Sequence, residues 1–429
     1  MTKYPDAGFA VISDLHFYDT SLGYEGAAFE KELSLDRKML AESEELLDYM
    51  IKDLLKSNIK FLLVCGDLTK DGEALNHEKL SAKLQILVNY GIKVIVTPGN
   101  HDINNYSAAE FLGNVKSIVN SVSAEDFKKI YAEMGYGCSL MNDSSSLSYV
   151  SEPVPGLWVV AIDSCRYDEN KANGIPSVVG GMIKAGTEQW LSNVLSEAKK
   201  NYKAVIALMH HGIIEHWNGQ SRLYPDSLIK NHNHIANLLV SSNVGFVFTG
   251  HNHAQSIVEA DFSGKRLCDV GTGSLVTYPC PIRFCNLNDS KLTINTKTIA
   301  DKLRPGTNFS NVAKNVLKKA MAVASIGDLL KYRISDVDAE YIANVLGEAF
   351  AAHYSGDADI RLRPAFQSDK LSLWGKIIFA IQQRYVIDPL WESVSPRNNN
   401  ASIALNPEFA SEKYRTDKRF ATMAKKSAA

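Results

Sequence analysis

The chain of 429 residues lacks the features that mark membrane, metal-thiolate and strongly charged proteins. No apolar run reaches the roughly 18 residues that a helix needs to cross a bilayer, so we expect no membrane span. The six cysteines form no Cys-x-x-Cys pair, which argues against zinc-finger chemistry and favours free thiols. The formal net charge of -2 gives no overall attraction to nucleic acid, so we expect no stable nucleic-acid complex.

The two ends of the chain and its length lead to expectations about localisation and the number of structural units. The first residues lead into an apolar segment at 9–13 with no signal-peptide core before it, and we therefore expect a cytoplasmic protein. The basic tail at 411–429 is interpreted as a solvated end rather than a nucleic-acid-binding segment. A chain this long exceeds one ordinary hydrophobic core, which predicts two units.

Five short polar clusters each follow an apolar segment. The segments, at 9–13, 60–65, 92–96, 204–209 and 244–248, are typical of strands buried on both faces. Ligands bind at the carboxyl ends of strands in open α/β sheets, so the clusters are expected to face one cleft. They are Asp14-Leu15-His16, Gly66-Asp67, Gly99-Asn100-His101-Asp102, His210-His211 and Gly250-His251-Asn252-His253.

The residue types in these clusters indicate a metal site. Carboxylates, imidazoles and an amide oxygen suit manganese, iron, zinc or cobalt rather than soft thiolate-bound ions. Two ions about 3.5–4 Å apart usually share a bridging carboxylate, so one aspartate would contact both. Each cluster alone has an ordinary structural explanation, such as a strand-end cap or a turn. Their ordered recurrence at one sheet edge favours the metal site.

Other polar residues are weaker candidates. Of His210 and His211, we expect only one to be a ligand. Side chains outside the five clusters are expected to have structural roles, and they are His216, His232, His234 and Asp163.

The pattern along the chain predicts a layered α/β domain followed by helices. Helical periodicity over 33–57 and 73–90 links the first three strands, and further helices are expected at 124–134, 187–200 and 227–241. Short segments at 255–260, 266–270, 283–287 and 292–298 fit an antiparallel meander. Helical spacing then returns at 311–325, 335–354 and 371–391. We predict a catalytic domain at residues 1–304 and a helical C-terminal domain or cap at 305–429.

Three sequence blocks are similar to those of a known family. They are Gly-Asp-Leu-Thr-Lys-Asp-Gly at 66–72, Thr-Pro-Gly-Asn-His-Asp at 97–102 and Gly-His-Asn-His at 250–253. Across about residues 9–300 the chain resembles the calcineurin-like metallophosphoesterase superfamily, and within it the bacterial class III cyclic-nucleotide phosphodiesterases. The resemblance implies an α/β sandwich of two packed β-sheets flanked by helices.

The resemblance also assigns roles to the polar clusters. It implies that Asp14, His16 and His253 hold one metal ion and that Asn100, His210 and His251 hold the other. Asp67 would bridge the two ions, and His101 would occupy the position of the catalytic histidine. The ions expected from the resemblance are manganese, iron or both, although zinc or cobalt would also suit these ligands. One departure is Gly212, where the family often has proline after the two histidines.

These expectations define a reaction. A dinuclear, metal-dependent phosphodiesterase would hydrolyse its substrate by attack of a metal-activated hydroxide. His101 would donate a proton to the leaving alkoxide, and Asp102 would accept a hydrogen bond from the His101 ring and fix its tautomer. The substrate would be a small phosphodiester, with cyclic nucleotides such as 3',5'-cAMP as candidates.

Several alternatives remain open on the sequence alone. A phosphomonoesterase or protein phosphatase could use the same core, and a non-catalytic scaffold could keep the fold. The helical extension could cover the cleft, complete the core or form a homo-oligomer.

Overall fold

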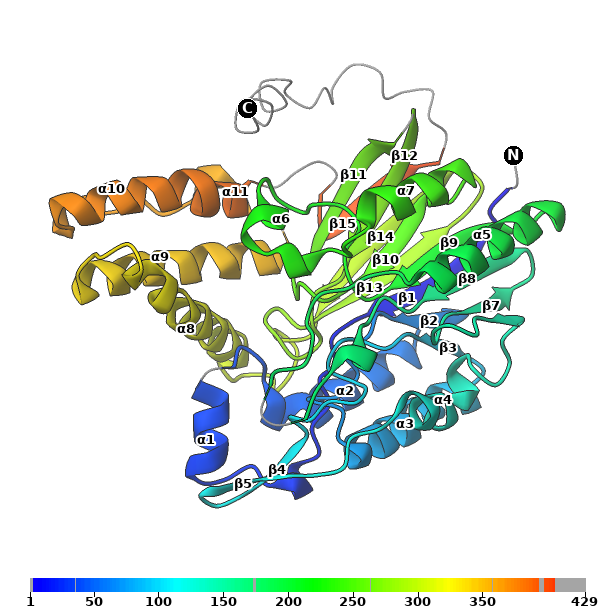
Figure 1. Cartoon of the computed structure of the whole chain (residues 1–429), viewed down its shortest axis with the longest axis horizontal. Helices are drawn as coiled ribbons and strands as arrows, with labels where there is room; N and C mark the ends of the chain where they lie inside the picture. Colours follow the sequence, from blue (N-terminus) through cyan, green and yellow to red (C-terminus); the bar gives the residue numbers. More distant parts are fainter. Residues whose placement is uncertain are drawn as a thin grey trace.

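The computed structural model describes residues 3–34, 36–172, 175–262, 264–356, 358–392 and 397–405. Two β-sheets packed face to face form its centre, with helices against their outer faces and a helical region to one side (Figure 1). The predicted mixed α/β fold with a C-terminal helical region is confirmed. The basic tail at 411–429 lies outside the described residues.

The first sheet has six strands in the order β15-β14-β13-β1-β2-β3. Its parallel strands are β1 (Ala7–Ile12), β2 (Phe61–Val64) and β3 (Lys93–Val96). An antiparallel group continues from β1, formed by β13 (Pro281–Leu287), β14 (Lys291–Thr298) and β15 (Asn400–Ala404). The strand β15 was not predicted, and it places residues 400–404 in the same sheet as β1.

The second sheet has seven strands in the order β11-β12-β10-β9-β8-β7-β6. Its parallel strands are β8 (Leu157–Ile162), β9 (Ala204–Met209), β10 (Phe246–Thr249) and β12 (Lys265–Gly271). Antiparallel strands flank them at both edges, namely β6 (Met141–Asn142), β7 (Tyr149–Val154) and β11 (Ser256–Phe262). A separate hairpin joins β4 (Ala109–Leu112) to β5 (Val115–Ile118).

The core between the sheets explains why the strand sequences are almost wholly apolar. Successive side chains of a strand point to opposite faces. Phe9 stacks on Phe61 in its own sheet, with ring centroids 4.7 Å apart, and meets Phe248 of the other sheet edge-on at 5.4 Å. In β8, Val159 belongs to the core between the sheets, whereas Val160 packs in the core beneath the helices. Both faces of these strands are therefore buried.

The helices form the two outer layers. α2 (Ser43–Leu54) and α3 (Ala74–Asn89) contribute to the core of the first sheet, and α4 (Ala124–Ile130) packs against α3. α5 (Ala185–Lys200) and α7 (His232–Ser241) cover the second sheet. α1 (Ala27–Ser34) lies beside the β4–β5 hairpin, and the short α6 (Gln220–Leu223) follows β9.

Two sequence predictions about these elements were wrong. The single helix expected over 33–57 is interrupted between α1 and α2, because the Met39 N–H donates to Val276 O at 2.7 Å, outside the helix. The antiparallel meander expected after residue 255 is divided between the sheets: β11 and β12 belong to the second, and β13 and β14 to the first. Hairpin periodicity is the same in either sheet, so the sequence could not show where the chain crosses over.

The C-terminal helices form most of a further apolar core, which also includes Trp217 and Ala254. α8 (Phe309–Leu330) packs along α9 (Asp336–Ser355), and α10 (Leu373–Gln382) and α11 (Asp388–Trp391) pack against α9. The Gln255 N–H donates to Tyr354 O at 3.2 Å, which joins the end of α9 to the segment after the last polar cluster. Among the helices in the described ranges, none combines the length and hydrophobicity required to cross a membrane.

Candidate metal centre

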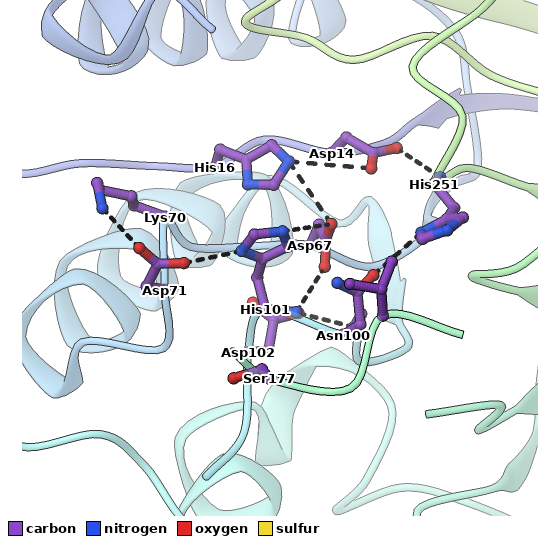
Figure 2. Close-up of polar contacts among 12 residues, drawn as sticks. Asp14, His16, Asp67, Lys70, Asp71, Asn100, His101, Asp102, Ser177 and His251 are labelled. Atoms are coloured by element: carbon purple, nitrogen blue, oxygen red, sulfur yellow. Dashed lines mark hydrogen bonds and ion pairs between the residues drawn. The ribbon is translucent and has the colours of Figure 1, made fainter. Parts of the chain in front are cut away.

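The five polar clusters meet at one end of the sandwich. Each begins just after the carboxyl end of β1, β2, β3, β9 or β10, so both sheets contribute to the same place. Figure 2 shows side chains from four of these clusters converging, with Asp67 at the centre. The structure thus brings together every residue that the sequence proposed as a ligand.

The backbone is strained at most of these positions. Five of the seven candidate ligands have a positive φ: Asp14 (50°), His16 (37°), Asp67 (49°), His251 (65°) and His253 (56°). The left-handed conformation costs a residue other than glycine about 1–2 kcal/mol, and it persists only where the surroundings hold it in place. Such outliers cluster at functional sites because they aim side chains that a relaxed loop would turn elsewhere.

Gly99 allows two of the clusters to approach each other. A Cβ atom at Gly99 would collide with the backbone N and the carboxylate of Asp67. Because Gly99 precedes Asn100 on the loop after β3, its missing side chain brings that loop against the loop after β2. Glycine is therefore required here for close contact, whereas Gly66 (φ 88°) is required for its turn.

The first group of ligands lies around Asp14. The possible ligand atoms of Asp14, His16, Asp67 and His253 are all within 4.8 Å of one another, and all four residues are buried. His253 Nε2 is 3.2 Å from both Asp14 Oδ1 and His16 Nε2. Among the described residues, Asp14 Oδ1 and His16 Nδ1 have no hydrogen-bond partner. Unpartnered buried polar atoms are costly, and a cation would satisfy the carboxylate oxygen.

The second group consists of three acceptors that face one another. His210 Nδ1 lies 2.7 Å from Cys65 O, and His251 Nε2 lies 3.1 Å from Asp226 O. A carbonyl can only accept, so these nitrogens carry the protons and leave lone pairs on His210 Nε2 and His251 Nδ1. The two lone-pair nitrogens are 3.2 Å apart, and each is 3.0 Å from Asn100 Oδ1. A cation among the three would convert their repulsion into attraction.

The spacing of these atoms fits metal coordination. Nitrogen ligands about 2.1 Å from an ion and about 90–110° apart lie roughly 3.0–3.4 Å from one another. The closest nitrogen pairs in both groups are separated by 3.2 Å. Asp67 Oδ2 lies between the groups, 3.6 Å from His16 Nε2 and 3.5 Å from His210 Nε2. The residues present therefore fit two ions, with Asp67 placed to contact both.

The electrostatic environment keeps several of these imidazoles neutral. Burial lowers the pKa of His16 and His251 well below the ordinary value, reinforced by Lys38 at His16 and by the neighbouring histidines at His251. Burial and the adjacent Arg37 lower the pKa of His253 to about 4. Only a neutral imidazole can ligate a metal ion, and the lowered pKa values mean that protons do not compete with a metal ion for these rings at neutral pH.

Comparison with known proteins assigns the family. The model of the calcineurin-like phosphoesterase family matches residues 8–255, more than half of the chain. The chain belongs to this family. It is a metal-dependent phosphoester hydrolase, and a dinuclear metal site is typical of such proteins. No curated protein has a sequence significantly similar to it.

Solved structures with similar folds include two phosphatases. A dimetal phosphatase from Danio rerio is 15% identical, with a TM-score of 0.48, and the match covers 69% of this chain and 97% of that one. A purple acid phosphatase from yellow lupin (Lupinus luteus) seeds is 11% identical, with a TM-score of 0.43, covering 70% of this chain and 53% of that one. Similarity this distant does not indicate which ester a calcineurin-like phosphoesterase hydrolyses.

The structure distinguishes the two adjacent histidines of this calcineurin-like phosphoesterase. His211 lies close to His210 and His251, but both of its ring nitrogens are engaged. Its Nδ1 is 2.8 Å from Ser164 Oγ, and its Nε2 is 2.8 Å from Val179 O. Burial and the neighbouring His210 lower the pKa of His211 to about 3. The ring has no nitrogen left to offer, so the geometry favours His210 as the ligand of the pair.

The remaining polar residues lie outside the metal centre. His234 contacts Glu188 at 2.6 Å, and His232 contacts Ile229 O at 3.2 Å. Buried His216 lies 3.4 Å from Asp269. The Asp163 carboxylate accepts hydrogen bonds from its own loop and from Tyr167. None of these four described residues belongs to either ligand group.

The partner of the His101 ring is Asp71 rather than Asp102. His101 Nδ1 lies 2.9 Å from Asp71 Oδ1 (Figure 2). Lys70 Nζ is 2.5 Å from the other Asp71 oxygen and 2.7 Å from Glu32, which holds the carboxylate in place. Burial opposes protonation of the ring, but Asp67 and Asp71 outweigh it and raise the pKa of His101. The charged ring is thus stabilised at His101, whereas protonation is opposed at His16, His251 and His253.

The predicted hydrogen bond from His101 to Asp102 was therefore wrong. The Asp102 carboxylate accepts instead from the backbone N–H groups of Leu68 (3.1 Å), Thr69 (3.0 Å) and Gly99 (2.8 Å). It joins the loop that carries Asp67 to the loop that carries Asn100. Burial and the nearby Asp67 raise the pKa of Asp102 to about 7, against the opposing effect of these three donors. Asp102 positions the loops, and Asp71 positions the ring.

Sequence reasoning missed Asp71 although a signal was present. Asp71 lies within the block 66–72 that supports the family resemblance, one residue before Gly72. Its role depends on a contact with a residue 30 positions later, which no local periodicity reveals.

Proposed function

We propose that this calcineurin-like phosphoesterase is a dinuclear, metal-dependent phosphodiesterase, with cyclic nucleotides such as 3',5'-cAMP as candidate substrates. The observation that carries the proposal is the pair of converging ligand groups with Asp67 between them, bordered by a histidine whose pKa is raised by Asp67 and Asp71. Ions bound there would supply the positive charge that activates a water molecule and neutralises phosphate oxygens. The remaining chemistry falls to side chains of the protein.

The proposed ligand sets follow the two groups. Asp14, His16 and His253 would hold one ion, and Asn100, His210 and His251 the other. Asp67 would contribute to both, and its second oxygen, Oδ1, accepts the His101 backbone N–H at 2.9 Å, which fixes the carboxylate. These nitrogen and oxygen donors are compatible with manganese, iron, zinc or cobalt, and we propose manganese, iron or both.

We propose that His101 donates the proton that the leaving group needs. Its Nδ1–H is held by Asp71, so the other nitrogen, Nε2, carries the transferable proton in the imidazolium. Nε2 lies 4.0 Å from Asp67 Oδ2 and so faces the metal centre. Loss of the Nε2 proton leaves a neutral ring that keeps its bond to Asp71, so the ring does not reorient during the reaction.

The charges beside the metal centre support a diester substrate. A phosphodiester carries one negative charge, whereas a phosphomonoester carries close to two at neutral pH. Lys70 is paired with Asp71 and Glu32, and Lys38 lies 3.3 Å from Asp36. The two lysines are therefore neutralised by carboxylates, which leaves less cationic charge for a phosphomonoester dianion than these side chains would supply unpaired.

A substrate panel tests this proposal. The full-length protein would be reconstituted separately with manganese, iron, zinc or cobalt and assayed with bis(p-nitrophenyl) phosphate, 3',5'-cAMP and p-nitrophenyl phosphate. We expect the two diesters to have the higher kcat/KM. Dominant turnover of p-nitrophenyl phosphate would overturn the diesterase assignment in favour of a monoesterase or protein phosphatase. Absence of turnover in every metal form would favour a non-catalytic scaffold.

We also propose a division into a catalytic domain at residues 1–304 and a helical domain at 305–429. The apolar core formed mainly by α8–α11 supports this boundary, although Trp217 and Ala254 of the first unit also belong to it. The return of β15 to the first sheet means that the second unit is not helical throughout.

A further inference from the structure

Arg37 is a cation at the edge of the metal centre with an incomplete set of partners. It lies in the loop between α1 and α2, where the sequence predicted helix. Its Nε donates to His253 Nδ1 at 3.4 Å. Within the described part of the chain, no hydrogen bond or ion pair to its two terminal amino groups is present. An arginine has five N–H donors, so most of its capacity is unused.

The contact with His253 cannot coexist with the proposed role of His253 as a ligand. His253 Nδ1 accepts from Arg37 only while the ring proton is on Nε2, the nitrogen that faces Asp14 and His16. Ligation through Nε2 requires the proton on Nδ1. In a ligating His253 the Nδ1–H can donate to Thr277 Oγ1, which lies 3.4 Å away. The same Nδ1–H would face the Nε–H of Arg37, and two donors cannot form a hydrogen bond with each other. A ligating His253 therefore releases Arg37.

The groups around Arg37 favour its charged form. Burial opposes the charge, but Tyr354, Asp36, Asp14 and Asp67 raise the pKa of Arg37. Tyr354 lies at the end of α9, and its backbone O accepts the Gln255 N–H, so the helical region is fixed beside the loop that carries His253. Neither carboxylate of the metal centre is within ion-pair distance of Arg37, which leaves the guanidinium beside His253 without an anion of its own.

We propose that Arg37 binds a non-bridging phosphate oxygen of the substrate, and thereby makes the recognition of the phosphoryl group depend on metal loading. The proposal rests on the proposed phosphodiesterase function. A guanidinium presents paired N–H donors that match two oxygens of a phosphate group, and charge-assisted bonds of this type are stronger than neutral ones. Arg37 would act on binding, whereas His101 would act on proton transfer.

The test uses the full-length, metal-reconstituted protein and two variants at this position. R37Q removes the charge, and R37K keeps it without the paired geometry. The matched control is R304Q, which removes an exposed arginine paired with Glu45. Three quantities would be measured: metal content, affinity for inorganic phosphate by calorimetry, and kcat and KM with bis(p-nitrophenyl) phosphate.

We expect R37Q to weaken phosphate binding about 10- to 100-fold and to raise KM by a similar factor, with kcat changed much less. R37K should recover part of the loss, and R304Q should match the wild type. Two metal equivalents should remain in every variant. Unchanged phosphate affinity in R37Q would overturn the proposal. A parallel loss of metal and phosphate binding would also overturn it, because Arg37 would then serve only to support His253.

The same design separates the two proposals. If the wild type prefers monoesters, the diesterase assignment fails, while the phosphate affinity of R37Q still decides the role of Arg37. Should R37Q fail to fold, R37K provides the measurement: wild-type phosphate affinity in R37K would refute recognition by a paired guanidinium.

Discussion

Replacement of Asp71 by asparagine tests the proposed proton donor most directly. D71N keeps the size of the side chain and removes the charge that holds His101 Nδ1 at 2.9 Å. A hydrogen bond to a charged partner contributes about 1.5–3 kcal/mol. The His101 side chain is 31% exposed, so solvent screening places the effect near the lower end of that range. We therefore expect kcat to fall roughly 10- to 30-fold for a substrate with an alkoxide leaving group.

The choice of leaving group makes this prediction specific. An alkoxide leaving from 3',5'-cAMP needs a proton, whereas p-nitrophenolate is stable without one. D71N should therefore impair cAMP hydrolysis strongly and bis(p-nitrophenyl) phosphate hydrolysis only slightly. H101A should likewise impair cAMP hydrolysis more than bis(p-nitrophenyl) phosphate hydrolysis, with larger losses than D71N. The matched control is D168N, which removes an exposed carboxylate paired with Lys184 on the surface.

The pH profile gives an independent measurement. A general acid must be protonated, so activity is lost as pH rises through the pKa of His101. Asp71 raises this pKa, and its neutralisation must lower it. The alkaline limb of kcat should consequently move to lower pH in D71N and stay in place in D168N. Equal losses on both substrates with an unmoved limb would refute the assignment of Asp71 as the residue that positions His101.

Three further predictions concern the metal ions and the fold. D67N should bind fewer than two metal equivalents by elemental analysis and lose most activity, because one carboxylate faces both ligand groups; full loading with normal turnover would contradict the bridging position. H210Q should lose metal while H211Q keeps two metal equivalents. Equal metal content in the two variants would contradict the choice of His210 rather than His211 as the ligand. Burial lowers the pKa of His77 in the folded protein to about 4. As pH falls below about 6.5, His77 is therefore protonated in the unfolded protein but still neutral in the folded protein, which favours unfolding. The free energy of unfolding by urea should then drop by about 2 kcal/mol from this group between pH 7 and 4.5, and H77Q should lack that part of the slope.

The strands and the ligand groups could be predicted because both depend on local sequence. A strand buried on two faces must be apolar throughout, so runs such as 204–209 stand out. The polar residues that follow them stand out by contrast, and parallel strands bring their carboxyl ends to one edge. The helices at 73–90 and 187–200 were predicted to within a few residues for the same reason, since their amphipathic period is local.

The errors and omissions arise where distant segments decide the outcome. The periodicity over 33–57 predicted a continuous helix, but the hydrogen bond from Met39 to Val276 interrupts it and leaves Arg37 in a loop. A hairpin pattern does not identify its sheet, so the division between β12 and β13 was missed. The strand β15 is defined by its pairing with β14 rather than by its own short sequence.

The sequence by itself determined the α/β class and the metal-binding polar clusters, because these follow from residue type and local period, and the resemblance of its motif blocks to a known family implied phosphoester hydrolysis. Only the tertiary structure decided which neighbour each side chain has. In the folded chain the His101 ring contacts Asp71, the Asp102 carboxylate bonds the two loops that carry Asp67 and Asn100, and Arg37 contacts His253. Hydrogen bonds and charges act over a few ångströms in space, and residues 30 or 200 positions apart become neighbours only when the sheets pack.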